Sequence, residues 1–261
     1  MTEAKMSGVT ESGVKATEMK ASEILAVIKA GKPVQFIDKI ILDDLDFTQS
    51  SEPYIMDTQT LQVEVPVNIF FNNCIFMGKV SSTGKQKSLS VIASFRRNLV
   101  FTGCDFRGEV DFSRTVVWGQ VNFSQSNFRE VATFNNICVW AKDSYFSEVK
   151  AEKDFSMIYA SYAGNLYAIS AQFSGVVSFQ EMSVKGKLLF NHSVFSQRAG
   201  FDLMEIGGNV FFHRAKFGKV ADFSFSRFLN NADFSSAEFA EKGNFEKTFF
   251  QNPAIFDKTN F

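Results

Sequence analysis

The chain of 261 residues has few of the residues from which catalytic and metal centres are usually built. It contains two histidines and three cysteines. Two histidines without a third ligand make a weak metal site, and an odd number of cysteines does not form a disulfide framework. A glycine-rich phosphate loop and a G-x-S-x-G elbow are also missing from the sequence. We therefore expect a protein that is not an enzyme and that has no metal site and no cofactor.

An excess of charge of one sign and a long apolar run are also missing. The chain has 27 basic and 28 acidic residues, which are interspersed, and a net charge of −1. A nucleic-acid surface needs a basic patch, so direct nucleic-acid binding is disfavoured. The sequence has no run of 18 apolar residues, so no transmembrane helix is predicted. Residues 1–20 lack the apolar region of a signal peptide. These absences favour a cytoplasmic protein without a membrane span.

Phenylalanine, with 32 residues, is the dominant feature of the chain. From Phe95 to Phe261 an apolar residue, in most cases Phe, recurs at alternating steps of five and six residues. One extra residue interrupts the pattern between Val139 and Phe146. Two steps of each length make a coil of 22 residues. A strict short repeat of this kind is typical of a solenoid.

A second small or apolar residue lies two positions before each repeat position, as in the pair Val110 and Phe112. Residues two apart on an extended strand point to the same side. Each unit is therefore predicted to be a very short strand with two inward side chains. Units of five or six residues leave room only for a corner between strands, so the chain must turn inward at every unit.

Several units resemble the pentapeptide-repeat family, in which a small residue and Asp or Asn precede Leu or Phe. They are ADFSS at 232–236, ADFSF at 221–225 and VDFSR at 110–114. The resemblance implies an all-β solenoid, a right-handed four-sided β-helix with one unit on each side. Some members of the family imitate duplex DNA and modulate type II topoisomerases. The resemblance therefore implies a DNA-mimicking modulator as an alternative function, which the near-neutral charge disfavours.

The layout predicted along the chain has three parts. Residues 1–20 are expected to be a flexible tail. Residues 21–33 are expected to form a short N-terminal capping helix, with Ser22 as its N-cap, that covers the first edge of the coil. Residues 34–261 are expected to form the β-helix, with loop insertions near 48–62 and 77–90 that interrupt the repeat.

Outward positions one coil apart should stack at about 4.8 Å. On one side of the coil this column is polar and comprises Asp111, Thr133, Ser156, Ser178, Gly200, Asp222 and Asn244. On another side it comprises Asn122, Tyr145, Tyr167, Leu189, Phe211, Asp233 and Ile255. Four successive large apolar residues of the second column are therefore predicted to face water.

The only two tryptophans, Trp118 and Trp140, are 22 residues apart and should stack at the neighbouring corner. We call the following six residues the aromatic stripe: Trp118, Trp140, Tyr145, Tyr167, Leu189 and Phe211. Extended apolar patches mark interaction sites, so the stripe is the candidate interface for a protein partner of unknown identity. Two alternatives stay open. The rings stabilise only the sheet, or the N-terminal helix or the 77–90 loop folds back over them.

The cysteines and histidines have ordinary structural interpretations. Cys74 and Cys104 occupy small inward positions and should pack in the core. Cys138 should point outward. His192 and His213 fall at outward positions on adjacent coils, where solvated surface histidines are expected.

The repeat continues to Phe261. This leaves Phe250, Phe256 and Phe261 at the end of the stack, where bare strand edges are costly. We expect a second copy to cover them in a two-fold, end-to-end homodimer, which the family resemblance also suggests. The alternatives are that the final coil frays or that the natural chain continues.

The function predicted from the sequence is that of a non-enzymatic protein-binding scaffold or adaptor that uses the aromatic stripe. A module of a larger assembly or a secreted effector is a further alternative.

Overall fold

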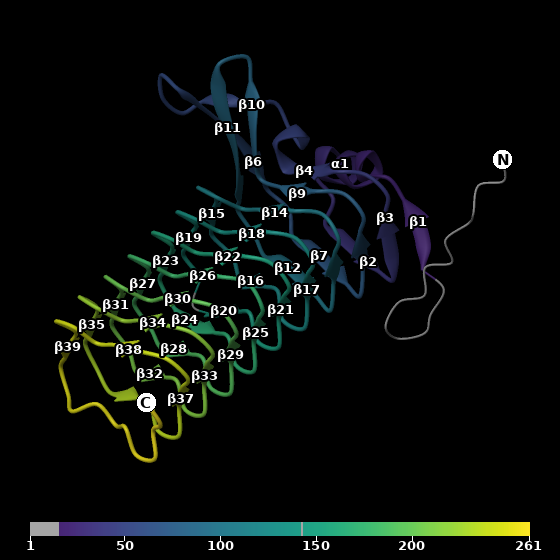
Figure 1. Ribbon diagram of the computed structural model, residues 1–261. Coiled ribbons are helices and arrows are strands. Elements are labelled where there is room, and N and C mark those ends of the chain that lie inside the picture. The colour runs from purple at the N-terminus through teal and green to yellow at the C-terminus, as the bar shows by residue number, and fades with distance from the viewer. Residues whose placement is uncertain (1–15, 142) are drawn as a thin grey trace.

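The computed structural model describes residues 16–141 and 143–261, which form an elongated four-sided β-solenoid with strands of successive coils stacked side by side (Figure 1). Four sheets make the four sides, with 9, 10, 9 and 11 strands. The chain visits them in a fixed order, which we number sheets I to IV. Every pairing between successive coils is parallel, as in Val116 with Cys138. The solenoid expected from the repeat is confirmed.

Sheet I contains β2 (Val34–Ile37), β7 (Ile69–Asn72), β12 (Leu99–Thr102), β16 (Val121–Asn122), β20 (Asp143–Tyr145), β24 (Asn165–Tyr167), β28 (Leu188–Leu189), β32 (Val210–Phe211) and β36 (Ala232–Asp233). Sheet II contains β1 (Thr17–Met19), β3 (Lys39–Ile41), β8 (Ile75–Phe76), β13 (Asp105–Phe106), β17 (Asn127–Phe128), β21 (Lys150–Ala151), β25 (Gln172–Phe173), β29 (Val194–Phe195), β33 (Lys216–Phe217) and β37 (Glu238–Phe239).

Sheet III contains β4 (Leu45–Asp46), β9 (Val80–Ser81), β14 (Val110–Asp111), β18 (Ala132–Thr133), β22 (Phe155–Ser156), β26 (Val177–Ser178), β30 (Ala199–Gly200), β34 (Ala221–Asp222) and β38 (Gly243–Asn244). Sheet IV contains β5 (Tyr54–Ile55), β6 (Thr60–Val65), β10 (Thr83–Gln86), β11 (Leu89–Phe95), β15 (Val116–Val117), β19 (Cys138–Val139), β23 (Ser161–Tyr162), β27 (Ser183–Val184), β31 (Glu205–Ile206), β35 (Arg227–Phe228) and β39 (Phe249–Phe250).

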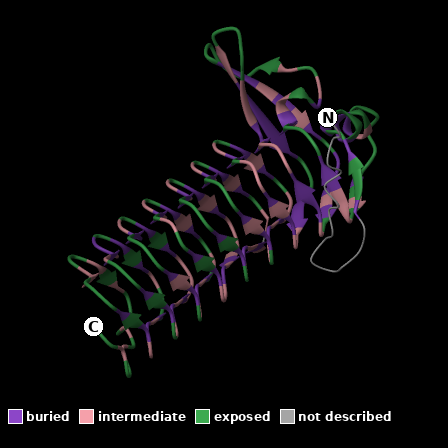
Figure 2. Ribbon diagram, turned by 45° about the vertical axis from the view of Figure 1, so that its right-hand side comes forward, coloured by how far each residue is buried: buried purple, intermediate pink, exposed green. Residues whose placement is uncertain are grey.

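The core is a set of phenylalanine stacks that run along the solenoid axis. Phe223 is fully buried between Phe201 and Phe245, with ring centroids 4.7 and 4.9 Å away and nearly parallel planes. Phe190 and Phe234 are also buried, as the repeat predicts. Burying a Phe side chain contributes about 2 kcal/mol before entropy costs. The buried inner and more exposed outer positions alternate along the short strands (Figure 2).

The corners explain why steps of five and six residues alternate. Each five-residue step turns through one residue with a left-handed backbone, such as Gly103 at φ 61° and Arg114 at φ 58°. The six-residue steps turn without a left-handed residue, and here the backbones of successive coils approach closely. A Cβ built on Gly186 would lie 2.6 Å from the carbonyl oxygen of Gly164. A corner with one left-handed residue is one residue shorter. These residues lie at the corners between sheets I and II and between sheets III and IV, so opposite corners have the same length.

The aspartates of the repeat have a local structural role. Asp111, Asp222 and Asp233 each accept a hydrogen bond from the backbone N–H two residues later, at 3.0, 3.1 and 2.8 Å. This Asx turn satisfies a donor at the end of each short strand. Asp222 and Asp233 lie on the outer face as expected, but they are half-buried rather than fully exposed. The reason is that these hydrogen bonds hold their carboxylates against the backbone.

The N-terminal segment differs from the prediction in two details. Helix α1 (Ala21–Lys29) packs against β2 and β4 and buries Ile24 and Ile28 in the main core. Its N-cap is Lys20 instead of Ser22, because the Lys20 N–H is held by the Glu23 carboxylate at 2.8 Å. Residues 17–19 of the expected tail form β1, which pairs with β3 at the edge of sheet II. Residues 1–15 of that tail lie outside the described residues.

The two predicted insertions contain more regular structure than loops. A 3₁₀ turn, η1 (Phe47–Gln49), leads to β5, which pairs antiparallel with β6. Strand β10 forms an antiparallel hairpin with β11, and the two hairpins stand away from the coil (Figure 1). Between them, β9 is an ordinary strand of sheet III. The pattern missed these strands because they do not have the small-x-Phe spacing of the coil.

Candidate protein-binding surface

The outer column of sheet I has the register that the repeat predicts. Asn122 pairs with Tyr145, and then the column continues through Tyr167, Leu189, Phe211 and Asp233. The four large apolar side chains are all half-buried, so each keeps part of its surface in solvent. They form one continuous row on one side of the solenoid.

Tyr145 and Tyr167 stack with ring centroids 5.0 Å apart. The Tyr145 hydroxyl donates to Asp143 at 3.4 Å. Partial burial, followed by the charge of Asp143, raises the pKa of Tyr145. The phenol therefore stays protonated at neutral pH and keeps its hydrogen bond to Asp143. Asn165 bridges the two coils, because its amide donates to Asp143 at 2.6 Å and to the Tyr167 hydroxyl at 3.3 Å.

The four large residues of the row, Tyr145, Tyr167, Leu189 and Phe211, interrupt the Asx turns of the coil. Asn122 and Asp233, at the two ends of the row, each accept a backbone N–H from two residues later, at 2.8 Å in both cases. The four large residues cannot make this contact, because their side chains have no oxygen close enough to accept the backbone N–H two residues later. The matching positions of sheet III carry small or polar side chains in place of large apolar ones. Positions that depart from a local rule of the fold are often found at functional surfaces.

The tryptophan corner adjoins this row. Trp118 and Trp140 stack with centroids 5.8 Å apart and 16° between their planes. Their exposed fractions are 47% and 53%. The guanidinium of Arg96 lies 5.2 Å from the Trp118 ring and is held by Glu64 at 2.8 Å. Both tryptophans therefore present large rings to solvent beside sheet I.

The sheet I part of the aromatic stripe, around Tyr167, lies away from the elements that were expected to cover it. Helix α1 packs on β2, and β24 is five strands further along sheet I, which corresponds to about 24 Å. The β10–β11 hairpin extends sheet IV at the same N-terminal end (Figure 2). Among the described residues, neither element reaches Tyr167. Residues 1–15 lie outside this description.

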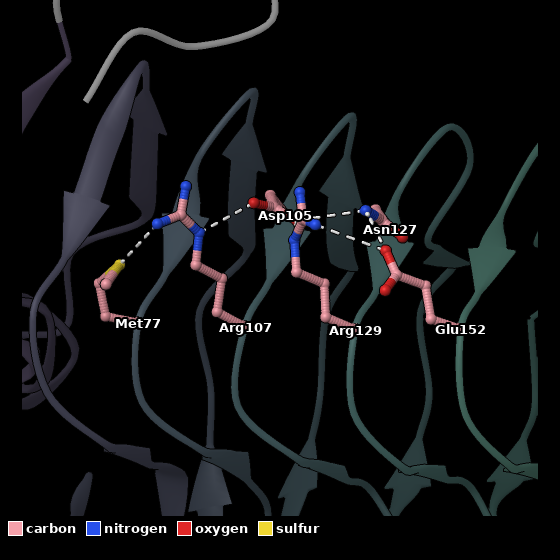
Figure 3. A network of polar contacts seen from close by, with 6 residues as sticks. All are labelled: Met77, Asp105, Arg107, Asn127, Arg129 and Glu152. Atoms are coloured by element: carbon pink, nitrogen blue, oxygen red, sulfur yellow. Dashed lines mark hydrogen bonds and ion pairs between the residues drawn. The ribbon is translucent and has the colours of Figure 1, made fainter. Parts of the chain in front are cut away.

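Several charges on the coil are paired between neighbouring turns. Arg227 contacts Glu205 at 2.7 Å, and Lys219 contacts Glu241 at 2.8 Å. A larger network follows sheet II and its corner (Figure 3). It comprises Met77, Asp105, Arg107, Asn127, Arg129 and Glu152. Acidic and basic side chains alternate in these contacts, so they do not form the continuous negative stripe that a DNA mimic needs.

The cysteines and histidines take the positions expected of them. Cys74 and Cys104 are buried, and Cys138 is half-buried on the outer face of sheet IV. Burial raises the pKa of the Cys138 thiol. His192 and His213 lie on adjacent coils with ring centroids 5.8 Å apart, and His213 contacts Ser235 at 2.8 Å. In residues 16–141 and 143–261, no group of three His, Cys, Asp or Glu side chains is placed to hold a metal ion.

The rings of the candidate dimer end continue the core stacks. Phe250, Phe256 and Phe261 lie 5.5, 5.2 and 5.0 Å from the rings one coil before them. Phe250 and Phe256 are half-buried, and Phe261 is 64% exposed. This end of the coil therefore offers an apolar layer.

The sequence analysis missed a second exposed apolar set. Tyr159, Leu203 and Phe225 lie at left-handed corner positions between sheets III and IV, with about half of each side chain exposed. Their spacing in multiples of 22 residues was the available signal. Glu181 separates Tyr159 from Leu203 in this column, so it is not a continuous apolar row.

A family model described as pentapeptide repeats matches residues 93–137 with nine copies. Residues 93–137 therefore contain pentapeptide repeats, and the four-sheet parallel coil continues the same solenoid architecture on both sides of them. No curated protein and no solved structure matches the chain. Within the described ranges, no helix has the length and apolar character needed to cross a membrane.

Proposed function

We propose that this protein is a non-enzymatic binding scaffold that holds a protein partner on the aromatic stripe. One observation carries the proposal. Four consecutive coils of sheet I replace the Asx-turn residue with Tyr145, Tyr167, Leu189 and Phe211, while Asn122 and Asp233 keep the turn on either side.

The energetics of such a surface favour binding. Each half-buried ring has apolar area left to bury, at about 25 cal/mol per Å². Trp and Tyr are enriched among residues that dominate interface energies. The stripe is built on paired strands with stacked rings, so its side chains lose little freedom when a partner docks. Three free thiols suit a reducing compartment such as the cytoplasm.

Affinity capture from the native cell tests the proposal. Tyr167→Lys places a charge in the stripe, and Ser178→Lys places the same charge on sheet III of the same coil. We expect Tyr167→Lys to lose partners that the wild type and Ser178→Lys retain, with similar melting temperatures for all three. Equal capture by both lysine variants would contradict the proposal.

The alternative function, imitation of DNA toward a type II topoisomerase, requires a run of unpaired acidic side chains. The contacts Arg227–Glu205 and Arg129–Asp105 are of the opposite kind, because they neutralise acids between coils. We therefore rank this alternative below the scaffold. A topoisomerase supercoiling assay that showed inhibition by this protein would reverse the order.

A homodimer through the apolar layer of Phe250, Phe256 and Phe261 is a separate part of the proposal. The exposed ring of Phe261 and the half-buried rings beside it support it. Light scattering of the 261-residue chain should give twice the monomer mass, and Phe256→Asp should halve that mass. A wild-type chain that scatters as a monomer at micromolar concentration rules the dimer out.

A further inference from the structure

A column of outward residues follows the corner between sheets IV and I. Its backbone ladder runs from Arg96 through Trp118 and Trp140 to Ala163 and Lys185, each residue bonding to the coil before it. The first three side chains form a stack, with 5.2 Å from the guanidinium to the first indole and 5.8 Å between the indoles. The stack is a cation followed by two aromatic rings.

The column then contains a small residue. Ala163 is half-buried and carries only a methyl group, and Lys185 on the next coil is exposed. With about 4.8 Å between coils, Trp140 and Lys185 are separated by about 10 Å along the axis. A planar ring above Ala163 would lie about 5 Å from each of them. That separation resembles the spacings already present in the Arg96–Trp118–Trp140 stack.

Two exposed lysines lie beside Ala163, against one acidic residue that is already hydrogen-bonded. Lys185 and Lys187 are both exposed. Lys185 lies in the same corner column as Trp140, two coils further along the solenoid. Asp143, at the same corner, already accepts hydrogen bonds from Asn165 and Tyr145. Acidic residues on a partner would therefore meet cations here.

We infer that the Ala163 position receives an aromatic side chain of the partner protein, sandwiched between Trp140 and Lys185 and flanked by acidic residues. This inference rests on the proposed function and specifies its partner. An aromatic ring on the free side of Trp140 extends the stack, and the Lys185 ammonium supplies a cation on the opposite face of the incoming ring. The completed order is cation, three rings, cation.

The protein carries its own reporter, since Trp118 and Trp140 are its only tryptophans. The probe is a blocked acidic pentapeptide with a central phenylalanine, which does not fluoresce on tryptophan excitation. The comparison peptide has alanine at the centre. Ala163→Phe fills the position with the chain's own ring. The matched control, Ser174→Phe, adds the same ring at the opposite six-residue corner of the same coil, where Ser174 is exposed.

We expect the phenylalanine peptide, at millimolar concentration, to change the tryptophan emission of the wild type and of Ser174→Phe. The alanine peptide and the Ala163→Phe variant should bind about tenfold more weakly, as for one lost aromatic contact. Lys185→Ala should also weaken binding of the phenylalanine peptide.

No response to the phenylalanine peptide, or an equal response of Ala163→Phe, overturns the inference. A response to adenosine monophosphate in place of the peptide also overturns it and points to a nucleobase. These results leave the scaffold proposal untouched if Tyr167→Lys still loses captured partners that Ser178→Lys retains. If Tyr167→Lys loses none, the scaffold proposal fails by itself.

Discussion

Tyr145 and Tyr167 lie one coil apart on sheet I, with their ring centroids 5.0 Å apart and only 8° between their planes. Each covers one face of its neighbour and leaves ring edges and a hydroxyl at the surface. The same geometry, one ring above another at the coil spacing, holds the core together on the inside. The solenoid thus repeats its interior packing on part of its exterior, where binding would cover it.

Replacing Leu189 with Asn should restore the local rule of the coil. The new amide can accept the N–H two residues later, as Asn122 does at 2.8 Å. This hydrogen bond contributes about 1 kcal/mol, which offsets the lost burial of a half-buried leucine. We expect a melting temperature close to the wild type but weaker partner capture. Leu188→Asn is the control, because Leu188 is fully buried and its loss should cost about 3 kcal/mol or more. Equal destabilisation by the two changes would show that the register is wrong.

Aspartate should have a large effect at one position and a small effect at another that is two residues away. Phe223 is buried between two parallel rings. Phe223→Asp puts an unpaired carboxylate in the core, so we expect about 4 kcal/mol of destabilisation or loss of folding. Phe225 is 47% exposed and left-handed at φ 57°. Aspartate tolerates that backbone, so Phe225→Asp should change stability by less than about 1 kcal/mol. Denaturant unfolding measures both, and a stable Phe223→Asp protein would refute the stacked core.

Left-handed corners offer a way to stabilise the protein. Leu203 has φ 59° and is half exposed, and such a backbone costs a non-glycine residue about 1 kcal/mol. Leu203→Asn should raise the free energy of unfolding by up to about 1 kcal/mol, since asparagine adopts this conformation more readily. Leu203→Ala separates the two causes, because alanine removes the side chain but keeps the strain. An alanine variant as stable as the asparagine variant would show that side-chain exposure, not strain, is the cause.

Acid should weaken the coil partly through Asp222. Partial burial acts to raise its pKa, but hydrogen bonds from Ser224 and Asn244 and the charge of Arg198 outweigh it, so the pKa is lowered from its ordinary value of 3.8. A carboxyl with a depressed pKa in the folded state stabilises the fold above the unfolded value, and this contribution is lost as pH falls through the folded value.

Asp222→Asn should therefore reduce the loss of melting temperature between neutral pH and pH values below about 4. Removing the donor with Asn244→Ala should reduce it in part. A pH dependence that is the same in the wild type and in Asp222→Asn would mean that other carboxyls carry the effect.

Much of the coil could be predicted because inward side chains face a space of fixed width. The position of Phe201 implies those of Phe212 and Phe223, and a slip by one residue would expose every ring. The neighbours in the outer column, such as Tyr167 and Leu189, follow from the same register. The N-terminal part was harder, since Lys20 caps α1 through a contact with Glu23, while Ser22 had the better capping propensity.

The sequence by itself determined the strand positions, the coil length and the outward direction of the aromatic stripe, because one short period governs all of them. The tertiary structure decided what lies beside what. It placed α1 and the β10–β11 hairpin at the N-terminal end, away from Tyr167, and stacked Arg96 on Trp118. It also assigned the left-handed backbone to alternate corners. These features depend on contacts between residues far apart in the chain, and a repeat in the sequence describes only its own spacing.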